Sequence, residues 1–117
     1  MGFLDKIFKK NNTSNETSYD TTNYQYALDF KKAFEKQDTG VMNILNQWVS
    51  YDNSDDDAYM FLASTIIYAG ARVHAGDTSM SVSKLKTLYQ KGLTSKYHDE
   101  ALYKWYVDTA KMFVSQL

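Results

Sequence analysis

Residues 58–73 read AYMFLASTIIYAGARV, and the rest of the chain is expected to fold around this stretch. From position 58 to position 71 no residue carries a charge, and apolar or small side chains would cover nearly every face of a helix. A helix that is apolar all round must be covered on most sides by protein or lipid. These 14 uncharged residues are too few to cross a bilayer, which takes about 20. The stretch therefore predicts a buried helix at the centre of a small helical domain.

Apolar residues recur at helical spacing in four further segments, which lie near 24–37, 41–51, 79–91 and 99–116. Alternation typical of strands is absent over any useful length. We therefore predict an all-α fold of about five helices. The face expected to be buried in the second segment consists of Val41, Ile44, Leu45, Trp48 and Val49, with Trp48 as a core anchor.

Polar residues and glycines indicate where these helices begin and end. The acidic run Asp52–Asp57 precedes the central helix, and carboxylates in a first turn cap free N–H groups and suit the helix dipole. Asp99 is expected to open the last helix in the same way. Gly76 is predicted to end the central helix and Gly92 the next one, with Asp77 or Thr78 capping the start of that next helix.

Residues 1–10, MGFLDKIFKK, form a short amphipathic segment with a basic flank. Phe3, Leu4, Ile7 and Phe8 fall on one side of a helix. Such a segment can lie in a membrane interface, dock in a partner's groove or pack on its own domain. It is not a secretory signal, because charged residues interrupt the apolar run and no small-residue cleavage site follows.

Two further parts follow along the chain. Residues 11–23 are polar and low in complexity, which predicts a flexible linker. Residues 24–117 then form a single all-helical domain, which suits a chain of 117 residues. The absence of Cys fits a reducing compartment. We expect a cytoplasmic protein, either free or peripheral at the inner face of a membrane.

Few residues suggest catalysis or metal binding. The two histidines, His74 and His98, have no third nitrogen ligand and no Cys to complete a transition-metal site. The run Asp52–Asp57 begins like a calcium loop, but Ala63 stands where the bidentate Glu is needed. Ser81 matches a Ser-x-x-Lys pattern without its companion motifs. We therefore expect no enzyme activity, no catalytic residue, no metal and no cofactor.

Nucleic acid is not the expected partner. The lysines of the second half are widely spaced, and the chain contains a single arginine, Arg72. Binding to a phosphate backbone needs a continuous cationic surface, and base recognition favours arginine. The partner is therefore expected to be another protein or peptide.

Two helix pairs within the chain can be aligned with each other, 41–51 with 56–73 and 79–91 with 99–116. The corresponding residues are Met42, Ala58 and Leu62 in the first pair and Leu85, Ala101 and Trp105 in the second. This pattern resembles the tetratricopeptide-like αα-repeat proteins, although the offset is longer than that family's usual repeat of about 34 residues. The resemblance implies a concave groove that receives a partner peptide. A closed up-and-down helical bundle has the same periodicity, so both architectures stay open.

The expected function is a non-enzymatic protein–protein interaction module, tethered by residues 1–10 to a membrane or a partner. Aromatic side chains are enriched at protein interfaces, and Trp105 is expected to pack within the domain instead. The partner-binding candidates are Tyr59, Tyr68, Tyr103 and Tyr106. The alternative is a small helical bundle that neutralises one specific target, as immunity and antitoxin proteins do. The oligomeric state stays open.

Overall fold

The computed structural model describes residues 21–51, 57–94 and 99–117, and these residues form α-helices joined by short turns. The helices are α2 (Thr21–Glu35), α3 (Val41–Tyr51), α4 (Ala58–Ala75), α5 (Val82–Thr94) and α6 (Glu100–Val114). The predicted all-α fold of about five helices is confirmed.

Some predictions concern residues outside the described part of the chain. They include the amphipathic segment 1–10, most of the linker 11–23, positions 52–56 of the acidic run, and His98. The first described helix begins at Thr21, so the end of the predicted linker belongs to α2.

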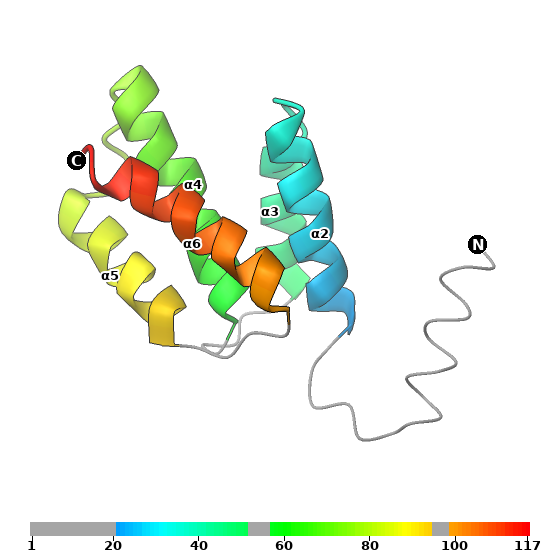
Figure 1. Ribbon diagram of the computed structural model, residues 1–117. Helices are drawn as coiled ribbons and strands as arrows, with labels where there is room; N and C mark the ends of the chain where they lie inside the picture. Colours follow the sequence, from blue (N-terminus) through cyan, green and yellow to red (C-terminus); the bar gives the residue numbers. More distant parts are fainter. Residues whose placement is uncertain (1–20, 52–56, 95–98) are drawn as a thin grey trace, which may run out of the picture.

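Each helix runs antiparallel to the one before it (Figure 1). The central helix α4 packs most extensively against α5 and α6, while α3 packs mainly against α2. The α2–α3 hairpin therefore lies beside a three-helix unit made of α4, α5 and α6. The two pairs aligned in the sequence, α3 with α4 and α5 with α6, are in contact but are not the most extensive contacts of the fold.

Helix α4 forms the core, as its sequence predicts. Ten of its 18 residues are buried, and Leu62, Ala63, Ile66 and Ala69 are fully covered. The hydroxyl of buried Thr65 donates a hydrogen bond to the carbonyl of its own helix, so it adds no unpaired polar group. Removing so much apolar surface from water is the main favourable contribution to folding.

The hairpin brings a second set of buried aromatic residues to this core. Phe30 of α2 and Trp48 of α3 are both fully buried, which confirms Trp48 as a core anchor. Their rings meet edge to face with centroids 6.4 Å apart. Val49 was expected on the same face of α3 but is 44% exposed, because it follows Trp48 and turns away from the core.

Two glycines that look alike in the sequence have different roles. Gly76 ends α4 in the left-handed conformation, with φ of 67°, and its N–H donates to the carbonyl of Arg72, as predicted. The prediction that Gly92 ends α5 is wrong, because the helix continues to Thr94. A Cβ at Gly92 would lie 2.6 Å from Cγ of Leu62, so this glycine allows α5 to approach α4 closely.

The N-terminal caps also differ in part from expectation. Asp57 caps α4, with its carboxylate accepting the N–H of Met60 at 3.2 Å. The prediction that Asp77 or Thr78 caps α5 is wrong, because Oγ of Ser81 accepts the N–H of Lys84 at 3.1 Å and so caps this helix.

Candidate functional site

Side-chain hydrogen bonds fasten the hairpin to the three-helix unit at one end, the lower end in Figure 1. The hydroxyl of Tyr24 in α2 donates to the carboxylate of Asp99 at 2.8 Å. The indole N–H of Trp48 in α3 is shared between Asn23 at 2.8 Å and the carboxylate of Asp57 at 3.2 Å. Because Asp57 and Asp99 also cap α4 and α6, each carboxylate stabilises a helix start and a contact between helices.

Asp99 is the more heavily used of these two caps. Its carboxylate accepts the N–H of Leu102 at 3.1 Å in addition to the Tyr24 hydroxyl. These two hydrogen bonds, the one from Leu102 first, hold the pKa of Asp99 below its usual value. The Tyr59 hydroxyl bonds to the backbone of Asp99, accepting its N–H at 2.9 Å and donating to its carbonyl at 3.1 Å.

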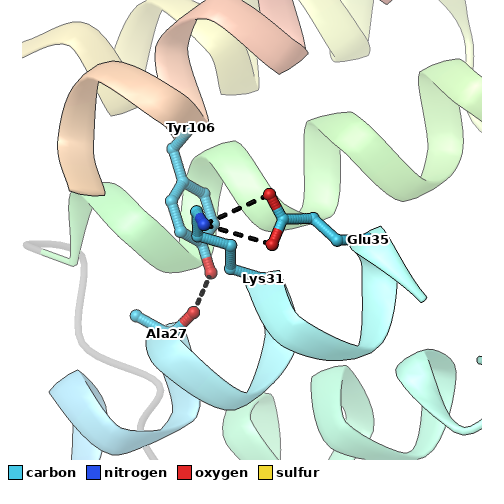
Figure 2. Close-up of polar contacts among 4 residues, drawn as sticks. All are labelled: Ala27, Lys31, Glu35 and Tyr106. Atoms are coloured by element: carbon cyan, nitrogen blue, oxygen red, sulfur yellow. Dashed lines mark hydrogen bonds and ion pairs between the residues drawn. The ribbon is translucent and has the colours of Figure 1, made fainter. Parts of the chain in front are cut away.

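Tyr106 provides a further link between the hairpin and α6. Its side chain is fully buried, and its hydroxyl donates to the carbonyl of Ala27 in α2 at 2.7 Å, as Figure 2 shows. Burial raises the pKa of this phenol well above its usual value, since the charged form would lose its hydration. Within the described part of the chain, every buried side-chain nitrogen or oxygen has a hydrogen-bond partner.

At the opposite end of the helices the hairpin and the three-helix unit enclose a groove of about 680 Å³. One wall comes from the end of α2 and the start of α3, and the other from the second half of α4 and from α6 between Trp105 and Phe113. The lining consists of Phe34, Glu35, Gln37, Asp38, Val41, Ile66, Ile67, Gly70, Ala71, His74, Trp105, Thr109, Met112 and Phe113.

Apolar and aromatic side chains dominate this lining. Phe34 of α2 reaches across to α6, where its ring meets Trp105 at 5.9 Å and Phe113 at 6.3 Å, both edge to face. Met112 lies on the wall that α4 and α6 form and is 50% exposed. Gly70 of α4, on that wall as well, adds no side chain to it. The groove thus presents apolar surface to solvent that the fold itself does not cover.

The formal charges of the lining are two carboxylates, on Glu35 and Asp38, beside the turn between α2 and α3. Glu35 pairs with Lys31 one turn earlier, at 3.1 and 3.2 Å, as Figure 2 shows. Asp38 accepts the N–H of Gly40 at 2.8 Å and is exposed. An apolar groove with an acidic rim suits a ligand that is apolar on one side and basic at its edge.

The four tyrosines proposed from the sequence do not lie together in this groove. Tyr59 and Tyr106 are buried, so their side chains support the core and cannot touch a partner of the folded domain. Tyr68 and Tyr103 are partly buried and pack against the core. The Tyr103 hydroxyl donates to the carbonyl of Gly92 at 2.9 Å, which ties α6 to α5.

Trp105 was expected to pack, and it does so while also lining the groove. Its ring meets that of Tyr106 edge to face at 4.9 Å, and Nζ of Lys31 lies 5.4 Å from its centre. The residues that sequence reasoning missed are Phe34 and Met112 as groove surface. Both carry the helical periodicity of core residues, so the sequence offered no signal that separated groove from core.

Comparison with known proteins gives no assignment: the chain matches no protein-family model, no curated protein and no solved structure. Across the described ranges, no three His, Asp or Glu side chains converge as metal ligands would. Over the same ranges, no helix is both long and apolar enough to cross a membrane.

Proposed function

We propose that this domain is a protein–protein interaction module whose groove between the α2–α3 hairpin and the α4–α6 unit takes an apolar segment of a partner protein. The observation that carries the proposal is the exposed apolar lining, with Met112 half exposed between two helical walls. Exposed apolar surface that is rimmed by polar residues is typical of binding sites.

A helix fits this groove better than a flat surface would. The walls are helices from two different packing units, and amphipathic helices commonly lay an apolar face into such grooves. The rings of Phe34, Trp105 and Phe113 give large contact area at little loss of side-chain freedom. Affinity would therefore come from burial of the ligand's apolar side chains, with the carboxylates of the rim setting orientation.

The experiment compares two variants that make the same chemical change at different places. Met112→Glu puts a charge into the groove, whereas Val49→Glu puts one on α3, outside the groove lining. Both native side chains are about half exposed, so both variants are expected to fold, which circular dichroism checks. Proteins that co-purify with the full-length chain should be kept by Val49→Glu and lost by Met112→Glu. Retention of the same proteins by Met112→Glu would contradict the proposal.

A further inference from the structure

We propose that the groove is occupied by residues 1–10 of the same chain, so that a partner protein must displace this segment to bind. The inference rests on the groove of the proposed function and goes beyond it by naming an internal competitor. It is carried by three observations, which concern apolar fit, charge and reach.

The first observation is a match of apolar surface. The segment has four large apolar residues on one helical face, namely Phe3, Leu4, Ile7 and Phe8. Left in water, this face has no protein to cover it. The groove also exposes apolar surface, because its lining is largely apolar. Its volume of about 680 Å³ has room for several large side chains. Docking would cover both surfaces at once.

The second observation is charge complementarity. Lys6, Lys9 and Lys10 flank the apolar face of the segment. The formally charged residues of the groove lining are Glu35 and Asp38, both acidic. Exposed ion pairs add little affinity, but opposite charges at a rim favour one orientation of the ligand over the reverse. The basic end of the segment is therefore placed beside the α2–α3 turn.

The third observation is reach. Residues 11–20 separate the segment from the start of α2, and ten residues can extend to about 33 Å. The groove begins near Phe34, about 20 Å along α2 at 1.5 Å per residue. The connection is thus long enough to bring the segment back along α2 to the groove of its own chain.

The short connection also makes weak affinity sufficient. A ligand held by a short linker experiences an effective concentration in the millimolar range. An intrinsic dissociation constant of about 1 mM would then already fill half of the grooves. Two turns of helix with four apolar residues need to bind no more tightly than this. A partner with a longer apolar face can displace the segment, because it buries more surface.

The absence of cysteine allows a direct test in the full-length chain. Asn11→Cys places a single nitroxide label next to the segment without changing its apolar or basic residues. Paramagnetic broadening is measured on the methyl signals of Met112 and Ile67, which line the groove, and of Leu93, an exposed residue of α5 outside it. We expect several-fold stronger broadening at the groove methyls than at Leu93. Ile7→Asp in the labelled chain should remove the difference.

Three outcomes would overturn the proposal. The first is equal broadening at Leu93 and in the groove. The second is broadening that arises only in a mixture, on the groove methyls of an isotope-enriched chain without spin label when a spin-labelled chain is added. This result would make a second copy of the chain the occupant. The third is a segment that binds anionic phospholipid vesicles while the groove methyls stay unaffected. The comparison of Met112→Glu with Val49→Glu tests whether the groove binds a partner protein, and its outcome does not depend on any of these results. The proposal of an internal competitor can therefore be refuted while the proposed function stands, and the reverse also holds.

Discussion

Two helical glycines make a matched pair that tests how closely the central helices pack. Gly70 lies in α4 and Gly92 in α5, and both are buried. A Cβ at Gly70 would lie 3.5 Å from the ring of Phe113, which is ordinary van der Waals contact. A Cβ at Gly92 would lie 2.6 Å from Cγ and Cδ2 of Leu62, closer than non-bonded carbon atoms approach each other in folded proteins. The same substitution to alanine should therefore have opposite effects at the two positions.

The magnitudes follow from two competing contributions. Alanine is favoured over glycine in a helix interior by about 1 kcal/mol, so Gly70→Ala should raise the free energy of unfolding by up to that amount. At Gly92 the same gain is offset by overpacking against a fully buried leucine, which costs about 1–3 kcal/mol. Gly92→Ala should therefore lower the free energy of unfolding by about 1 kcal/mol.

Urea unfolding of the full-length variants measures this difference, with thermal melting as a second readout. The two variants should differ in melting temperature by roughly 8 °C, at about 4 °C per kcal/mol for a domain of this size. Leu62→Ala serves as the control, since it removes the atoms that a new Cβ would meet. In that background Gly92→Ala should become neutral or stabilising. If Gly92→Ala stabilises the protein with Leu62 present, the close approach of α5 to α4 is wrong.

Two predictions concern pH. Tyr106→Phe should cost about 1 kcal/mol at neutral pH through the lost hydrogen bond to Ala27. Because burial raises the pKa of Tyr106, the wild type should lose stability as pH rises above about 10, by up to about 1.4 kcal/mol per unit more than the variant. An unchanged alkaline slope of the unfolding free energy in Tyr106→Phe would contradict this. For Asp99 the pKa is lowered by hydrogen bonds from Leu102 and Tyr24, so stability should fall as pH drops below about 4. In urea titrations at pH 2–5, the free energy of unfolding of Asp99→Asn should fall less with decreasing pH than that of the wild type. An equal fall in both proteins would mean that other carboxylates cause the loss of stability.

The helices themselves were predictable because their signals are local. The uncharged run of α4, the periodicity of α2 and the capping carboxylate Asp99 all act within one helix, so the sequence alone shows them. The prediction that Gly92 ends α5 is wrong because the role of this glycine depends on a contact with another helix. A glycine that ends a helix and one that admits a neighbouring helix look the same until the neighbour, here Leu62, is in place.

The candidate site was less predictable than the fold. The sequence makes four tyrosines candidates for partner contact, yet two of them, Tyr59 and Tyr106, are buried. Each hydroxyl forms a hydrogen bond with a backbone group more than 30 residues away in the sequence. The pattern of neighbouring residues in the sequence does not predict such a contact. The groove depends on how the hairpin sits against the three-helix unit, which is a property of the assembled fold. Phe34 and Met112 therefore looked like core residues until that placement was known.

Hydrogen bonds attach the start of α2 to the three-helix unit, whereas ring packing attaches its end. The hydroxyl of Tyr24 and the carbonyl of Ala27 form hydrogen bonds to that unit, and Phe34 packs against two aromatic rings of α6 beside the groove. The stretch from Tyr24 to Glu35 is about 16 Å long, so a rotation of roughly 5° about its start would shift the groove wall by about 1.4 Å and move the Phe34 contacts with it. Tyr24 and Asp99 thus help to position a wall of the groove, although neither residue lines it.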